Sequence, residues 1–165
     1  MIKKIIKIFT NFTSLHSKVI PRVFQSTMVK AQKIGTHDGA FHADEVLACT
    51  MLKMLPEFAD AEIVRTRKPE LLDECDIVVD VGGVFDHEKK RYDHHQKTFT
   101  DSVSSLIPEK KWTTKLSSAG LIYVHYGKDI IREILKEKST DELVEKIFDK
   151  VYSNFIEEQC DQQWR

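Results

Sequence analysis

Residues 76–83 read DIVVDVGG, an apolar run that is bounded by acidic residues and stopped by two glycines. Short β-branched runs that end at glycines are typical of strands, and this stretch gives the clearest strand signal in the chain. One further carboxylate, that of Asp80, lies inside the run. A carboxylate is expensive to bury alone, so we expect Asp80 to lie beside a counter-charge.

The sequence before this strand alternates between strand and helix patterns. Strands are predicted over 33–37 and 61–66, and residues 68–75 predict a short helix or turn. A longer helix is predicted over 45–55, with Asp44 as its expected cap. Its apolar side consists of Leu47, Met51, Met54 and Leu55. This alternation favours an α/β fold, in which a parallel sheet has helices packed on both faces.

Two more helices are predicted after a polar loop over residues 98–114. The first is expected to start at Ser117 or Ser118, and the second begins with a capping-box pattern, Ser139 followed by Glu142. Apolar residues recur at helical spacing in both helices. They are Leu121, Val124, Ile131 and Leu135 in the first helix, and Leu143, Ile147, Val151 and Phe155 in the second.

The bulk properties of the 165-residue chain allow one domain with a hydrophobic core. Lys and Arg number 25 against 26 Asp and Glu, so the total charge does not indicate a polyanionic partner. Three cysteines without paired spacing fit neither a disulfide framework nor a zinc ribbon, which favours a reducing compartment. The longest apolar run is too short to cross a bilayer, so no membrane partner is expected.

The first 32 residues have the composition of a mitochondrial presequence. Ser and Thr are frequent there, and no Asp or Glu precedes residue 38. One helical face would carry Ile2, Ile5, Ile6 and Phe9, opposite a face of lysines. The alternatives are a disordered tail and an initiation site at Met28. On each interpretation the fold is expected to begin at residue 33.

Polar residues gather where the predicted strands end. His37 ends the first strand, and His42 and Asp44 lie in the loop after it. Asp80 is near the end of its own strand, and Asp-His-His at 93–95 follows another short segment. Because sites in open parallel sheets form at the carboxyl ends of strands, we expect these residues to meet at one rim. Imidazole and carboxylate together suit Mn, Fe, Zn or Mg rather than Ca, and two cations sharing a carboxylate would suit displacement at phosphorus.

The run RYDHHQK places Asp93, His94 and His95 side by side. If His94 turns inward to a metal, the adjacent His95 can point along the loop at a phosphate oxygen, while Asp93 orients one imidazole. A polar surface turn is the competing interpretation, and each residue of the predicted rim has a similar structural explanation when taken singly. Their conjunction at one rim favours the metal site. His87 and His125 show no such convergence and are expected to be structural or surface residues.

Further groups that could hold an anion lie in two places. Basic side chains follow the second predicted strand, and they are Arg65, Arg67 and Lys68. Lys115, Ser117 and Ser118 begin a predicted helix, where free backbone N–H groups and the helix dipole favour phosphate. Simple capping of that helix by one of the two serines is the equally supported alternative.

Several long stretches form an ordered set of motifs: GTHDGAFHADEVLA, DAEIVRTR, DIVVDVGGVFD, RYDHHQKTF and TKLSSAGLIY. They resemble the melanocyte-proliferating-gene exonuclease family of the DHH phosphoesterase superfamily, which also contains the RecJ exonucleases and the manganese-dependent family II pyrophosphatases. The resemblance covers residues 33–158, and long motifs in matching order are far more specific than a lone DHH triplet. It implies a DHH-type catalytic domain over this range.

The resemblance also implies an activity and its requirements. These are hydrolysis of single-stranded RNA, or of another phosphodiester, from the three-prime end, in mitochondria and the nucleus. The expected cofactor is a divalent metal, manganese first and magnesium second, with two ions in the full-length proteins. No oligomeric state is indicated.

Individual roles carry over by motif. His37, His42 and Asp44 correspond to the first metal motif, with Asp38 as an alternative ligand because the spacing of the motif differs slightly. The resemblance makes Asp80 the bridging carboxylate. By the same correspondence, the catalytic and metal-binding residues include His94, and the phosphate contact is His95.

The chain departs from the family pattern at its C-terminus. Residues 159–165 form a divergent tail, in which Asp161 is out of register with the Asp-rich segment expected after NFIEE. We therefore expect a truncated chain without the family's second domain. Two functions stay open at this point: a metal-dependent nuclease, and a non-catalytic module that retains partial affinity for metal or phosphate.

Overall fold

In the computed structural model, which describes residues 31–164, five short strands form one sheet in the order β2-β1-β3-β5-β4. The strands are β1 (Lys33–Thr36), β2 (Glu62–Arg65), β3 (Ile77–Val79), β4 (Phe85–Asp86) and β5 (Arg91–Tyr92). β1 pairs in parallel with β2 and β3, and β3 pairs in parallel with β5. The antiparallel hairpin partner of β5 is β4. The predicted α/β fold is confirmed, with one antiparallel edge strand that the sequence did not indicate.

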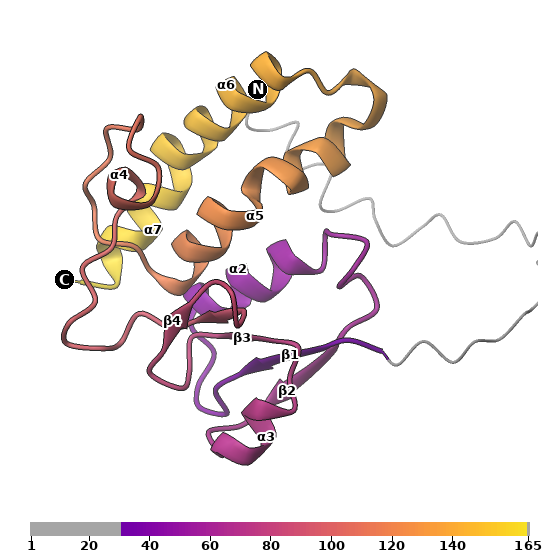
Figure 1. The fold of residues 1–165 in the computed structure, drawn as a ribbon, viewed down its shortest axis with the longest axis vertical. Coiled ribbons are helices and arrows are strands. Elements are labelled where there is room, and N and C mark those ends of the chain that lie inside the picture. The colour runs from indigo at the N-terminus through magenta and orange to yellow at the C-terminus, as the bar shows by residue number, and fades with distance from the viewer. Residues whose placement is uncertain (1–30, 165) are drawn as a thin grey trace, which may run out of the picture.

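Helices cover both faces of the sheet (Figure 1). One face carries α2 (Ala43–Leu52) and α5 (Ser118–Leu135), and α3 (Pro69–Asp73) lies on the other. Beyond α5 lies a continuous helical stretch that consists of α6 (Asp141–Val151), the π-helix η2 (Tyr152–Ile156) and α7 (Glu157–Gln162). The short elements are α4 (Val103–Leu106), which lies within the predicted loop, and the 3-10 turn η1 (Lys136–Lys138).

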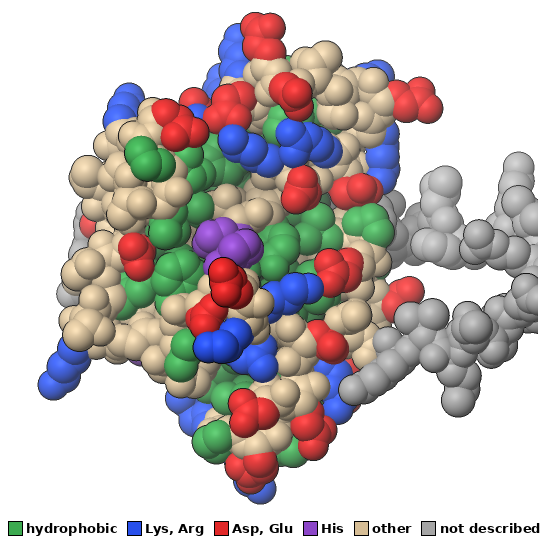
Figure 2. Space-filling model, in the orientation of Figure 1, with side chains coloured by type: hydrophobic (Ala, Val, Ile, Leu, Met, Phe, Trp, Pro, Cys, Tyr) green, Lys and Arg blue, Asp and Glu red, His purple; other side chains and the backbone are tan. Residues whose placement is uncertain are grey.

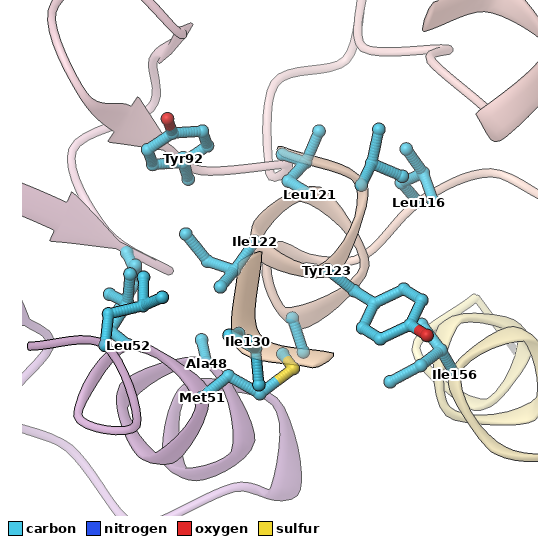
Figure 3. Close-up of a cluster of buried hydrophobic side chains, with 14 of the residues drawn as sticks. Ala48, Met51, Leu52, Tyr92, Leu116, Leu121, Ile122, Tyr123, Ile130 and Ile156 are labelled. Atoms are coloured by element: carbon cyan, nitrogen blue, oxygen red, sulfur yellow. The ribbon is translucent and has the colours of Figure 1, made fainter. Parts of the chain in front are cut away.

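The main core lies between the sheet, α2 and α5. Figure 3 shows Ile122 and Ile130 of α5 beside Ala48, Met51 and Leu52 of α2, and all five side chains are buried. A second, smaller cluster lies under α3 on the opposite face of the sheet, and it consists of Leu72, Cys75, Val78 and Val81. Successive residues of β3 thus enter opposite cores, which explains why its sequence is apolar at every position.

The two C-terminal helices depart from the sequence prediction in their details. Thr140, not Ser139, caps α6, and its hydroxyl accepts a hydrogen bond from the Leu143 amide. The buried stripe is also displaced by one residue from the predicted one, and consists of Val144, Phe148, Tyr152 and Ile156. Both stripes have helical spacing, but the displaced one contains the larger aromatic rings, which gain more by burial. Phe155 of the predicted stripe is consequently 53% exposed.

A glycine allows α5 and α6 to approach closely. A Cβ atom at Gly127 would lie 3.0 Å from Cδ2 of Tyr123 and 3.2 Å from Cε2 of Phe148.

Ser117 caps α5, because its Oγ accepts a hydrogen bond from the Gly120 amide at 3.2 Å. The predicted start of this helix is therefore confirmed.

The described residues include features that bear on compartment. No helix among residues 31–164 has the length and apolar character needed to cross a bilayer. Cys49, Cys75 and Cys160 are all free thiols. The predicted targeting segment, residues 1–32, lies almost wholly outside the described residues, and mitochondrial targeting stays a prediction.

His87 and His125 stack on each other with ring centroids 3.9 Å apart. On the face shown in Figure 2, histidine side chains gather over α5 among apolar groups, while acidic and basic side chains intermingle around them. Nε2 of His125 is buried without a hydrogen-bond partner. Burial, together with the neighbouring charge of His87, lowers the pKa of His125 to about 4.

We predict that His125→Phe makes the protein more resistant to acid. As the pH falls from about 6.5 to about 4, the unfolded chain gains a proton at His125 that the folded chain does not accept, which costs about 3 kcal/mol of unfolding free energy. Phe keeps the stacking partner of His87 and does not titrate. The advantage of the variant in melting temperature should therefore grow as the pH falls through this window, and parallel curves for the two proteins would contradict the prediction.

Candidate metal centre

Three parallel strands deliver polar side chains to one rim of the sheet. His37 directly follows β1, Asp80 directly follows β3, and His94 lies just beyond β5. The Asp80 carboxylate lies between the two imidazoles, with Oδ2 at 3.6 Å from Nε2 of His37 and Oδ1 at 3.5 Å from Nδ1 of His94. The structure thus brings together side chains from three separate loops, because parallel strands end at the same edge.

The backbone at Asp80 aims its carboxylate into this rim. Its φ is 58°, a left-handed conformation that aspartate tolerates better than most residues, and its amide donates to the Tyr92 carbonyl at 3.0 Å. The glycine turn after Asp80 is anchored by Asp93 instead, whose Oδ2 accepts from the Gly83 amide at 2.6 Å. Asp93, rather than Asp80, therefore anchors the glycine turn.

Two sets of side chains at the rim could each hold a cation, and they share Asp80. In each set, one ligand atom per residue lies within 4.8 Å of the others. The sets are His37, His42, Glu45 and Asp80, and Asp80, Asp93, His94 and His95. Nitrogen and carboxylate oxygen donors in these numbers suit Mn, Mg, Fe or Zn.

The donor atoms of the first set fit a bound cation. Nε2 of His37 and Oε2 of Glu45 are both buried, lie 3.6 Å apart, and have no hydrogen-bond partner. Buried polar atoms without a partner are costly, so a cation between them would satisfy both. The sequence prediction missed Glu45. Its signal was a second acidic residue in the first turn of a helix that starts at the rim.

The charge state of Asp80 points in the same direction. Burial and the nearby carboxylate of Asp44 raise the pKa of Asp80 to about 7, against the opposing effects of His95 and of a hydrogen bond from Ser118. Without a cation, the ionised form of Asp80 is therefore disfavoured. A divalent ion would reverse this balance, because it stabilises the carboxylate.

Asp44 does not cap its own helix. The N-cap of α2 is His42, whose amide donates to Oε1 of Glu45 at 2.7 Å. The carboxylate of Asp44 accepts from the amides of Ser118 and Ala119, at 2.9 and 2.8 Å, and so caps α5. Asp44 falls outside both sets of potential ligands, and its predicted role as a ligand stays a prediction.

His94 and His95 differ in exposure rather than in direction. Their rings stack with centroids 4.2 Å apart, so the expected divergence of the two side chains is wrong. His94 is buried, and its Nδ1 accepts a hydrogen bond from the Ser118 amide at 3.0 Å. The side chain of His95 is 61% exposed, and its Nδ1 lies 2.6 Å from Oδ1 of Asp93. The loop places one imidazole inside the rim and the other at the surface.

Asp93 orients His95 and tunes its charge. The hydrogen bond to Asp93 raises the pKa of His95, although burial acts in the opposite direction. Burial alone would raise the pKa of Asp93, but hydrogen bonds from His95 and from the Gly83 amide hold it below its usual value. The two shifts both favour a carboxylate beside an imidazolium at the surface of the rim.

The predicted phosphate site at the start of α5 has an internal occupant. Ser117 and Ser118 are fully buried, and the amides of Ser118 and Ala119 already bind the Asp44 carboxylate. Oγ of Ser118 lies 2.9 Å from Nδ1 of His94 and donates to Asp80. Ser118 therefore holds His94 and Asp80 in place, whereas Ser117 caps α5 and contacts Cys160, which removes both serines from our proposed substrate contacts. Lys115 stays at the surface, with its ammonium 3.3 Å from the Trp164 ring centroid.

The basic residues at the end of β2 and just after it brace the loop that carries His37. Arg65 donates to the carbonyls of His37 and Gly39, at 3.2 and 2.6 Å. Arg67 pairs with Asp38 at 3.3 Å, and both side chains are largely exposed. Asp38 thus turns toward solvent, whereas His37 turns toward Asp80. The geometry favours His37 over Asp38 as a ligand.

Comparisons with known proteins agree with the motifs. Residues 33–163 match the MYG1 exonuclease family, described as uncharacterised protein family UPF0160. The chain is 54% identical to the MYG1 exonuclease of Mus musculus over 134 residues, which are 81% of this chain and 35% of the relative. It is 54% identical to the MYG1 exonuclease of Homo sapiens over 138 residues, which are 84% of this chain and 37% of the relative.

A more distant relative shows the same coverage. The chain is 48% identical to a MYG1 protein of Saccharomyces cerevisiae over 127 residues, 77% of this chain and 36% of the relative. The chain therefore spans little more than a third of the length of these relatives. No solved structure matches it.

We predict opposite effects of Asp80→Asn on stability and on metal binding. As the pH rises from about 4 to about 7, the wild-type protein loses stability because Asp80 must ionise in a buried, negatively charged place. Asn tolerates the left-handed backbone and stays neutral, so the metal-free variant should melt above wild type at neutral pH. Manganese should raise the melting temperature of wild type but not of the variant.

The matched control for this experiment is Asp86→Asn. Asp86 lies at the end of β4 and pairs with Lys89. The control variant should respond to manganese as wild type does. An equal manganese shift in Asp80→Asn and wild type would remove Asp80 from the metal centre.

We also predict that Asp44→Ala destabilises the protein by about 2 kcal/mol, because it leaves the buried Ala119 amide without an acceptor and the Ser118 amide with only Nδ1 of His94. Urea unfolding would measure the loss. Asp38→Ala, which removes an exposed ion pair, should stay within about 0.5 kcal/mol of wild type. Similar losses in the two variants would show that Asp44 does not hold α5.

Proposed function

Because the chain belongs to the MYG1 exonuclease family, we propose that it carries the metal-binding part of a nuclease site. The observation that supports this proposal most directly is the place of Asp80, buried between His37 and His94 and shared by two sets of potential ligands. A carboxylate shared between two cation sites suits displacement at phosphorus, because two cations can stabilise the attacking and the leaving oxygen.

The side chains of the rim have two roles: some would bind cations, and others position the residues that bind them. We assign His37, His42, Glu45 and Asp80 to one cation and Asp80 and His94 to the second, beside which Asp93 and His95 form a hydrogen-bonded pair. Ser118 positions both His94 and Asp80 through its hydroxyl and amide. When bound, divalent ions would polarise phosphoryl oxygens and lower the pKa of water, so no side-chain nucleophile is needed.

His95 is the side chain best placed to meet the substrate. Its imidazole is exposed, and the Asp93 carboxylate favours its protonated form. A cationic N–H donor at the mouth of the centre can bind a phosphate oxygen and stabilise the charge that develops there. Of the residues that we predicted as phosphate contacts, His95 and Lys115 remain available to a substrate.

We propose single-stranded RNA, cleaved from the three-prime end, as the substrate of the full-length family protein. Manganese is the first candidate for its metal and magnesium the second, as the resemblance to manganese-dependent phosphoesterases implies. Action in mitochondria and the nucleus belongs to the same proposal. Support for it comes from the family membership and from the basic, acid-free N-terminal sequence.

A metal- or phosphate-binding module without catalysis is the second candidate. The feature that favours it is Trp164, whose ring packs against His94 with centroids 5.2 Å apart and donates through Nε1 to the Lys115 carbonyl. Trp164 thereby occupies space beside the rim that a polymer would need. It lies one residue beyond the segment that matches the family.

A cleavage assay on RNA labelled at the five-prime end separates the candidates. We expect manganese-dependent shortening from the three-prime end, which chelation with EDTA abolishes and a blocked three-prime terminus prevents. Asp80→Asn should lower the rate about a thousand-fold, since metal stabilisation of transition-state charge is worth several kcal/mol.

Asp86→Asn serves as the matched control, and its rate should equal that of wild type. Calorimetric manganese binding without cleavage in wild type would favour the binding module instead. Cleavage that survives in Asp80→Asn would refute the proposed site.

A further inference from the structure

A groove of about 240 Å³ lies between α2 and the edge strand β2. Its walls are mainly apolar and include Phe41, Val46 and Ile63, together with Thr36, Glu45 and Arg65. Pockets for drug-sized ligands measure about 300–1,000 Å³, so this groove has room for one ring system. Glu45 lines the groove and also belongs to a set of potential metal ligands, so the groove adjoins the metal centre.

One polar atom in the groove lacks a partner. Thr36 is only 2% exposed, and its Oγ1 makes no hydrogen bond. Leaving a buried hydroxyl unpaired costs free energy, and a ligand in the groove would recover it. Because a hydroxyl both donates and accepts, it matches the polar edge of a heterocycle.

An aromatic and cationic pair forms another part of the wall. Phe41 is 70% exposed, and the Arg65 guanidinium lies 3.8 Å from the centroid of its ring. Arg65 is fixed by hydrogen bonds to the carbonyls of His37 and Gly39. The pair is therefore held in place before any ligand arrives, as a platform on which a planar ring can stack.

We propose that this groove binds the base of the nucleotide whose phosphate lies at the metal centre. The inference rests on the proposed nuclease function, which it extends by a base-binding subsite. The walls are mainly apolar, and the two cations that line the groove, Lys53 and Arg65, already donate to backbone carbonyls, so an anion is disfavoured there. An aliphatic chain would leave Thr36 unpaired. A neutral heterocycle meets both conditions.

The test compares ligands that differ only in the base. Calorimetry on the whole chain with saturating manganese would measure the affinities of adenosine 5′-monophosphate and ribose 5-phosphate, and adenosine would be titrated without metal. We expect the nucleotide to bind roughly 5- to 150-fold more tightly than ribose 5-phosphate, as base stacking on an aromatic ring implies. Phe41→Ala should abolish this difference without weakening ribose 5-phosphate, while Phe41→Trp should preserve it.

Two further variants sharpen the result. Thr36→Val, which keeps the shape of the side chain, should cost the nucleotide about two- to tenfold in affinity and ribose 5-phosphate nothing. Phe155→Ala removes another exposed aromatic ring, which lies on η2, and should change neither affinity. Melting curves would establish that each variant is folded.

Several outcomes would overturn the inference. They are equal affinities for the two ligands in wild type, equal weakening of both by Phe41→Ala, and a change of oligomeric state in Phe41→Ala, which would assign the groove to a protein surface. If the base preference is lost while RNA cleavage is intact, the subsite fails and the nuclease stands. If adenosine binds through Phe41 but no cleavage occurs, the nuclease fails and the base-binding groove stands.

Discussion

The structure depends on the contact between the Asp44 carboxylate and the first amides of α5. Each oxygen accepts one buried N–H, and the two residues that donate lie on a helix more than seventy residues away in sequence. This contact fixes the start of α5 against the start of α2. It thereby places Ser118 beside His94 and Asp80. The apolar sides of α2 and α5 pack against each other in the main core.

Because of this contact, the buried carboxylates of Asp44 and Asp80 differ in how their charges are compensated. The positive end of a helix dipole and two hydrogen bonds compensate the charge of Asp44. Asp80 receives only one hydroxyl donor and lies beside Asp44, so its charge is not compensated by the protein alone. The protein thus compensates the buried charge of Asp44 but not that of Asp80. A cation bound at Asp80 would supply the missing compensation.

Local pattern and strand direction were sufficient to predict the centre of the fold and part of the rim. The strand in DIVVDVGG, the position of Asp80 at its end and the meeting of His37 with His94 are all consequences of short parallel strands. Contacts between segments that lie far apart in the sequence could not be predicted from local patterns. Asp44 was expected to cap the nearest helix, because nothing in its neighbours indicates a partner at Ser118. On α6, two stripes with equal spacing competed, and only packing against α5 decided between them.

The potential metal ligands and the surface that could meet a nucleic acid are largely different parts of this chain. All potential ligands lie between His37 and His95, within elements that α2 and α5 enclose. Both sets of potential metal ligands therefore come from the described residues of this chain. Gripping a polymer is different, because the exposed parts of the rim are His95, His42 and the loop around Phe41. If the proposed function holds, these surfaces would select one nucleotide, and a longer strand would need additional charge along its path, since phosphate contacts supply much of the affinity for nucleic acid.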